Sequence, residues 1–104
     1  MRNYKAKADK YKLPKVKADF LKAACTERDP DGRIILETDI KAVLKEMFAE
    51  DDVIKNWLFE YVTSKRPSWK QIYLRGVPCG KETFRIYRYR FYWLLDRRLS
   101  GASF

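Results

Sequence analysis

Apolar residues recur at helical spacing in three stretches of the first two thirds of the chain, and each stretch predicts an amphipathic helix. The first helix should cover residues 13–26, because Pro14 is tolerated in a first helical turn. The second and third should be capped by Thr38 or Asp39 and by Asp51, whose side chains suit an N-cap. The apolar positions are Val16, Phe20, Ala23 and Ala24, then Ile40, Val43, Leu44, Met47 and Phe48, and then Ile54, Trp57, Leu58, Tyr61 and Val62.

The last third of the chain predicts two more helices joined by a turn. Ser68 and Gln71 have the spacing of a capping box, so a short helix should start at Trp69. Gly76 stands where a left-handed residue ends a helix. After the Val-Pro-Cys-Gly turn, a final helix is expected over residues 81–99. The expected inward positions are Trp69, Ile72 and Tyr73 on the short helix and Phe84, Tyr87, Phe91, Leu94, Leu95 and Leu99 on the long one.

Five helices with short connections predict an all-α fold, a compact bundle that ends in a helix-turn-helix within residues 68–99. A length of 104 residues suits one such domain, which we place at residues 13–104. Residues 1–12 are lysine-rich and have no apolar period. They are therefore expected to form a basic, flexible arm.

Residues 29–32, Asp-Pro-Asp-Gly, predict a turn. Their Asp-x-Asp-Gly spacing is also found in calcium-binding loops. In that register Thr38 occupies the twelfth position, where such a loop needs a bidentate Glu, so no calcium site is expected. Residues 34–36, Ile-Ile-Leu, predict a short strand or a buried connection.

Composition argues against most enzymatic chemistry. The chain has no histidine, and Cys25 and Cys79 are not spaced as a CxxC pair. The commonest zinc ligands and any Ser-His or Cys-His nucleophilic pair are therefore missing, and we expect no catalytic activity, cofactor or metal. No run approaches the roughly 18 apolar residues of a membrane span, and no signal peptide is visible. We therefore expect a cytoplasmic protein that does not contact membranes.

Charge is distributed unevenly along the chain, whose formal net charge is +9. Residues 1–17 hold seven basic residues and one acid, a balance of +6, and residues 65–104 hold ten and two, a balance of +8. Residues 18–64 hold six basic residues and eleven acids, a balance of −5. Two basic ends of this kind favour a phosphate backbone as the partner.

The run RGVPCGKETFRIYRYRFYWLLDRR, residues 75–98, combines a Gly-apolar-Pro turn, a Thr-aromatic pair and a helix rich in arginine and aromatic residues. This pattern resembles the C-terminal end of small phage and prophage regulators of the autolysin-regulatory-protein type. Their helix-turn-helix is similar to region 4 of sigma factors, which reads promoter DNA. The residues that carry the resemblance are Gly76, Val77, Pro78, Thr83, Phe84, Arg88 and Arg90.

The resemblance implies that the final helix enters the major groove of DNA. Lys81, Glu82 and Arg85 would then face the bases, with Ile86 and Tyr89 beside them, because Arg can bind guanine and Glu can accept from cytosine. The phosphate contacts would be Arg88 and Arg90 on the same helix and Ser68 and Lys70 on the short helix before it.

The spacing also differs from that of a simple helix-turn-helix. The apolar residue after the turn comes about two positions late, at Phe84, and bulky Ile72 replaces the usual alanine. Either the turn is longer, or the two helices cross differently. Cys79 is expected in the turn or at the N-cap, where the helix N-terminus would lower the pKa of its thiol.

Several of these side chains also suit structural roles. Glu82 favours a helix N-terminus, and Arg85 has Glu82 or the acidic middle of the chain as an ion-pair partner. Arg97 and Arg98 suit the carbonyls at the end of the last helix. The remaining aromatic residues divide into Tyr87, Phe91 and Trp93, expected in the core, and Tyr89 and Tyr92, expected on a second apolar face for a partner.

We therefore expect a DNA-binding transcriptional regulator of phage or mobile-element type, with double-stranded DNA as its partner. One alternative is a protein-interaction module that binds a protein such as RNA polymerase through the acidic middle and the outer aromatics, and another is an RNA binder. A homodimer is a further expected form, although no zipper is visible. An enzyme is the weakest alternative, because the only dense carboxylate set surrounds a turn: Glu27, Asp29, Asp31, Glu37 and Asp39.

Overall fold

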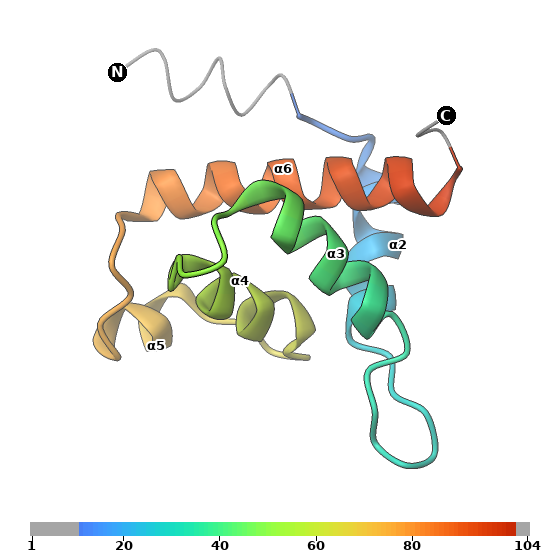
Figure 1. The fold of residues 1–104 in the computed structure, drawn as a ribbon, viewed down its shortest axis with the longest axis horizontal. Helices are drawn as coiled ribbons and strands as arrows, with labels where there is room; N and C mark the ends of the chain where they lie inside the picture. Colours follow the sequence, from blue (N-terminus) through green and yellow to red (C-terminus); the bar gives the residue numbers. More distant parts are fainter. Residues whose placement is uncertain (1–10, 102–104) are drawn as a thin grey trace.

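The computed structural model describes residues 11–101, and within this range the chain forms five helices and no strand (Figure 1). The predicted all-α class is therefore confirmed. The helices are α2 (Lys15–Cys25), α3 (Glu37–Met47), α4 (Ile54–Thr63), α5 (Trp69–Leu74) and α6 (Lys81–Leu99). Most of the predicted basic arm, residues 1–10, lies outside the described residues. None of the helices in residues 11–101 is long and apolar enough to cross a membrane.

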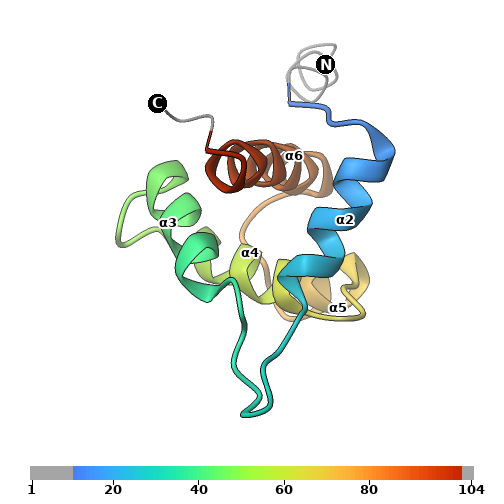
Figure 2. The same ribbon diagram turned by 90° about the vertical axis from the view of Figure 1, so that its right-hand side faces the viewer.

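The longest helix, α6, runs across the other four (Figure 1). Seen along its axis, α2 lies on one side of α6 and α3 on the other, with α4 and α5 beneath (Figure 2). One hydrophobic core joins these elements. Its members on α6 are Phe84, Phe91, Tyr92 and Leu95, and they pack with Leu21 and Cys25 of α2, with Ile40, Val43 and Leu44 of α3, and with Leu58 and Val62 of α4.

The predicted apolar stripes of α3 and α4 are confirmed, but that of α2 is wrong. Leu21 and Cys25 are the residues of α2 that are buried. The side chains of Val16 and Phe20, expected inside, are 83% and 67% exposed. Because α2 carries apolar residues on more than one side and covers only one flank of α6, hydrophobic spacing alone selects the wrong face of this helix.

The predicted cap of α3 lies two or three residues after its N-cap Leu36, and that of α4 lies two residues before its N-cap Val53. Helix α3 begins at Glu37, so Thr38 and Asp39 lie in its first turn and the N-cap residue makes no side-chain hydrogen bond. At the start of α4, Asp52 rather than Asp51 accepts a hydrogen bond from the backbone N–H of Ile54, at 3.0 Å. The displaced Asp39 instead accepts a hydrogen bond from Arg98 on α6, which ties α3 to α6.

The predicted turn at residues 29–32 is confirmed. The Oδ1 atom of Asp29 accepts from the backbone N–H groups of Asp31 and Arg33, both at 2.9 Å, and Gly32 adopts a φ of 83°. In the range 11–101, no group of three or more His, Cys, Asp or Glu side chains is placed to hold a metal ion. The following apolar residues form a connection rather than a strand, because only an isolated bridge joins Arg28 to Ile34.

Candidate nucleic-acid interface

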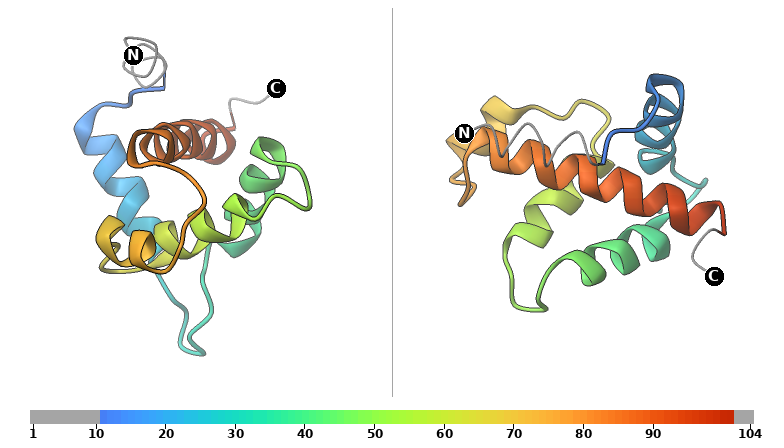
Figure 3. Two further views of the ribbon diagram at one scale, coloured as in Figure 1. Left: turned by 90° about the vertical axis from the view of Figure 1, so that its left-hand side faces the viewer. Right: turned by 90° about the horizontal axis from the view of Figure 1, so that it is seen from above.

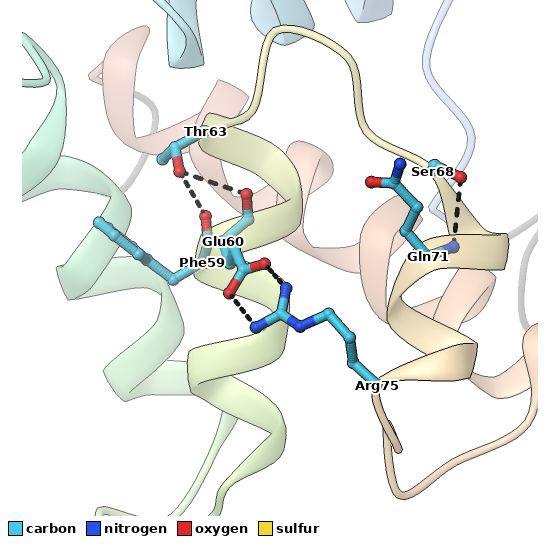
Figure 4. Close-up of polar contacts among 6 residues, drawn as sticks. All are labelled: Phe59, Glu60, Thr63, Ser68, Gln71 and Arg75. Carbon is cyan, nitrogen blue, oxygen red and sulfur yellow. Dashed lines mark hydrogen bonds and ion pairs between the residues drawn. The ribbon is translucent and has the colours of Figure 1, made fainter.

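The start and end of α5 are fixed by the local chemistry that its sequence predicts. The Ser68 hydroxyl accepts a hydrogen bond from the backbone N–H of Gln71, at 3.3 Å (Figure 4). At the other end, the N–H groups of Gly76 and Val77 donate to the carbonyls of Tyr73 and Ile72, both at 3.1 Å. These two bonds form a Schellman motif, and Gly76 has the left-handed φ of 96° that this motif requires.

Helix α5 is held against α4 by one ion pair and one buried side chain. Both guanidinium Nη atoms of Arg75 bind the Glu60 carboxylate (Figure 4). The guanidinium also lies over the Trp57 ring, 5.2 Å from its centroid. Ile72 is 4% exposed and is the buried residue of α5. Close by, in the last turn of α4, the buried Thr63 hydroxyl donates a hydrogen bond to the Phe59 carbonyl at 2.8 Å (Figure 4). This arrangement sets the position of α5 before α6 begins.

The connection between α5 and α6 runs from Arg75 to Gly80, which is longer than the turn of about 3–4 residues in a simple helix-turn-helix. The longer turn suggested by the late position of Phe84 is therefore observed. Val77 is buried within the turn, and Gly80, not Cys79, is the N-cap of α6. Partial burial raises the pKa of the Cys79 thiol, opposite to the lowering expected near a helix N-terminus.

The predicted base-facing residues lie together on the first two turns of α6. Lys81 and Glu82 are exposed, and Arg85 is half-buried. The Nε and Nη2 atoms of Arg85 donate to the Glu82 carboxylate at 3.0 and 2.8 Å, and its guanidinium lies over the Tyr89 ring. Of the two ion-pair partners considered for Arg85, the structure selects Glu82 on the same helix.

Helix α5 and the first turns of α6 lie at the same end of the molecule (Figures 1 and 3). The later turns of α6 are covered by α2 and α3, as shown by the ion pairs of Asp96 with Lys17 and of Arg98 with Asp39. The first turn of α6 is accessible, because Lys81 and Glu82 are exposed.

The two predicted phosphate-binding arginines of α6 lie on different faces of the helix. Arg90 is exposed, whereas the guanidinium of Arg88 lies 5.1 Å from the centroid of the Tyr61 ring on α4. Residues two positions apart on a helix point to opposite sides, so the two arginines do not share one face. The other two predicted contacts, Ser68 and Lys70, lie at the start of α5, where Lys70 is exposed and Ser68 is partly buried.

The aromatic residues of α6 are mostly structural. Phe91 is fully buried, and Tyr87 is half-buried with its ring in edge contact with the Phe48 ring. Trp93 is also half-buried, because the rings of Tyr11 and Trp93 meet edge to face and the Arg97 guanidinium covers the Trp93 ring.

Three predictions about apolar exposure are wrong. Tyr92, expected on an outer face, is only 7% exposed, because α2 packs over this side of α6. Tyr73, expected inside, is 63% exposed, since Trp69 and Ile72 alone fill the inner face of the short α5. Leu99, at the last turn of α6, is 40% exposed.

Two cations without a predicted role lie directly before α5. Lys65 and Arg66 are exposed and form no ion pair with any carboxylate of residues 11–101. The sequence contains a signal for a role of these two residues, because two consecutive cations immediately precede the Pro67–Ser68 start of a helix.

Comparisons of the chain with protein-family models, with curated proteins and with solved structures gave no match.

Proposed function

We propose that this protein is a DNA-binding transcriptional regulator of the phage or mobile-element type, which binds duplex DNA with α5 and the first turns of α6. In this mode the N-terminal residues of α6 approach base edges in the major groove, and the start of α5 contacts the sugar-phosphate backbone. The resemblance of residues 75–98 to small phage regulators supports the same function.

The observation that carries this proposal is the charge of the accessible end. From residue 65 to residue 90, the chain carries eight basic residues and a single carboxylate, Glu82. That carboxylate is already paired with Arg85, so Lys65, Arg66, Lys70 and Lys81 face no opposing charge from this segment. Burial is the main cause of the raised pKa of Tyr87, and the Asp52 carboxylate on the α3–α4 connection adds to it, so Asp52 limits the basic surface on that side.

The Glu82–Arg85 pair gives this surface a means of reading sequence. An arginine held in an ion pair is already ordered, so less side-chain entropy is lost when it binds the O6 and N7 atoms of guanine. The released Glu82 carboxylate is then free to accept from the amino group of a neighbouring cytosine. Lys70 would supply a phosphate contact that fixes the protein on the duplex, and Lys81 would add its charge beside the base-facing residues.

A salt titration of binding to duplex DNA tests the proposal. We expect the logarithm of the association constant to fall linearly with the logarithm of the salt concentration. The double variant Lys81→Gln/Arg85→Gln should bind more weakly, with a slope smaller by about 2, roughly 1 for each cation removed from the interface. The control Arg33→Gln/Lys45→Gln removes two exposed charges outside α5 and α6 and should change little. Absence of binding at low salt, or an equal loss in the control, would overturn the proposal.

A protein-interaction module is the second candidate, and the outer side of α5 favours it. Tyr73 and Leu74 are adjacent and are 63% and 72% exposed, which is unusual for large apolar side chains on so short a helix. The substitution Leu74→Asp separates the two functions. It should abolish capture of a protein partner if this surface is used, and it should leave the salt dependence of DNA binding largely in place. Preference for single-stranded RNA over duplex DNA in the same assay would instead favour an RNA binder.

A further inference from the structure

A cavity of about 450 Å³ lies between α2, α4 and α6, beside the proposed DNA-binding surface, with which it shares Lys65. Figure 2 shows how these three helices are arranged. Its volume lies within the range of about 300–1,000 Å³ that is typical of small-ligand sites. The residues that line it are Lys22, Ala23, Thr26, Tyr61, Val62, Ser64, Lys65, Pro67, Arg88 and Tyr92.

The cavity is strongly basic. Lys22 comes from α2, Lys65 from the α4–α5 connection and Arg88 from α6, and no carboxylate is among the lining residues. Neither lysine forms an ion pair with a carboxylate of residues 11–101. Three like charges around one hollow repel each other, and a bound anion relieves that repulsion.

Arg88 contributes the third positive charge to the lining of the cavity. The guanidinium is held in place by the Tyr61 ring, whose centroid lies 5.1 Å away. Its Nε atom is buried and has no hydrogen-bond partner within residues 11–101. A buried donor without a partner is unfavourable, so the guanidinium gains if a ligand draws it into a new arrangement.

The lysines are not needed to satisfy the ends of α2 and α4, although both helices end at this cavity. The Ala23 carbonyl accepts from the backbone N–H of Thr26 at 3.0 Å and from its hydroxyl at 2.8 Å. The Tyr61 carbonyl accepts from the N–H of Ser64 at 3.3 Å, and the Thr63 carbonyl accepts from Arg28 at 3.2 Å. These carbonyls already have donors, so Lys22 and Lys65 remain available to an external anion.

We propose that this cavity binds a phosphate group. A planar guanidinium binds two phosphate oxygens at once, and the two lysines supply the point charges that a dianion needs. The Ser64 hydroxyl oxygen accepts from the N–H of Arg66 at 3.2 Å, which leaves its O–H free to donate to a third oxygen. The phosphate group belongs either to a small molecule, namely free phosphate or a mononucleotide, or to a nucleic-acid strand. The proposal does not require DNA binding by α5 and α6.

The test is a titration of the ¹⁵N-labelled full chain with inorganic phosphate and with a mononucleotide, followed by NMR at constant ionic strength. We expect saturable shifts confined to amides near the cavity, including Thr26 and Ser64, and a shift of the Arg88 guanidinium signals. Titration with chloride should give no saturable shift. Linear, unsaturated shifts spread over all exposed lysines would overturn the proposal.

Variants separate the cavity from general charge effects. Lys22→Gln/Lys65→Gln should weaken phosphate binding at least tenfold, and Arg88→Lys should weaken it while keeping the charge. The charge-matched control Arg33→Gln/Lys45→Gln and the variant Lys81→Gln/Arg85→Gln should bind phosphate normally. Equal losses in the control would overturn the proposal.

A titration with duplex DNA, followed by the same NMR signals, distinguishes the two sources of the phosphate group. If the cavity holds a strand phosphate, DNA should produce the same local shifts, and these should disappear in Lys22→Gln/Lys65→Gln. If it holds a free phosphate or mononucleotide, these ligands should bind whether or not DNA does. Failure of phosphate binding with intact DNA binding would overturn this inference alone.

Discussion

The ring of Trp69 on α5 lies 5.6 Å, centroid to centroid, from the ring of Phe84 on α6, with 44° between their planes. The Phe84 ring also meets the Tyr61 ring of α4, at 5.3 Å. Phe84 is only 1% exposed, so these contacts lie inside the core. They join the three helices that would position the proposed DNA-binding surface, at a residue that directly precedes Arg85 and lies about one turn after Lys81.

Replacement of Phe84 by alanine should destabilise the fold severely. Truncating a buried aromatic residue removes its transfer free energy and leaves a cavity, at a cost of about 3–5 kcal/mol. That is a large fraction of the roughly 5–15 kcal/mol that stabilises a small domain. Urea unfolding followed by circular dichroism measures the loss. The control Tyr73→Ala removes an exposed aromatic side chain and should change the stability by about 0.5 kcal/mol or less. Similar losses in both variants would contradict the packing described for Phe84.

The extent to which the sequence predicts this fold depends on whether the signal is local. The bounds of α6, the Ser68 cap and the stop at Gly76 were all predicted, because each depends on residues a few positions apart. The inner face of α2 and the burial of Tyr92 were not predicted correctly, because both depend on which flank of α6 is covered by α2. Such packing is set by contacts between residues distant in the chain.

The candidate sites also contain some features that depend on local spacing and others that depend on contacts between distant parts of the chain. The spacing of three between Glu82 and Arg85 makes their ion pair predictable on one helix. The cavity around Arg88 is assembled from α2, α4 and α6, and no spacing along the chain brings Lys22, Lys65 and Arg88 together. It could only be found in three dimensions.

Gly76 should tolerate asparagine better than alanine. Its φ of 96° lies in the left-handed region, where a residue with a Cβ atom is disfavoured by about 1–2 kcal/mol. No atom lies within 4 Å of a Cβ built at this position, so the expected penalty is conformational rather than steric. Gly76→Ala should therefore lower the free energy of unfolding by about 1–2 kcal/mol, and Gly76→Asn by less. Thermal unfolding of the two variants checks this, and an equal loss would show that the turn rearranges.

Ser68 should have a structural role that can be separated from any contact with DNA. Ser68→Ala removes the hydrogen bond to the N–H of Gln71 and should cost about 1 kcal/mol, the usual effect of losing an N-cap. Ser68→Asp keeps a capping oxygen and should preserve the stability, while its negative charge should weaken duplex binding. Chemical denaturation and the salt titration measure the two effects. DNA binding by Ser68→Asp at the strength of the unmodified protein would exclude Ser68 from the interface.

Glu82→Gln should strengthen binding to duplex DNA of arbitrary sequence. The substitution removes the one carboxylate between residues 65 and 90 and releases Arg85, which now binds it at 2.8 Å. The surface gains one unit of positive charge, so the affinity at low salt should rise. The slope of the salt dependence should change by less than about 1, because Arg85 already contacts DNA in the proposed complex. Glu46→Gln, which removes an exposed carboxylate from α3, is the matched control. Weaker binding to every duplex would instead mean that the ordering of Arg85 by Glu82 outweighs the gain in charge.

The fold should lose stability as the pH rises above about 9, because of buried groups that resist ionisation. Burial raises the pKa of the Cys25 thiol from its ordinary 9.0 to about 12, and it also raises the pKa of the Tyr92 hydroxyl. Above pH 9 the unfolded chain releases the thiol proton while the folded chain keeps it, so alkali favours unfolding until the folded pKa is reached. Urea midpoints measured from neutral pH to about pH 11 should fall along this range. Cys25→Ala should start from a lower stability, because it leaves a cavity, but its midpoint should fall less steeply. If the urea midpoints of both proteins fall equally steeply, groups other than Cys25 cause the loss of stability at high pH.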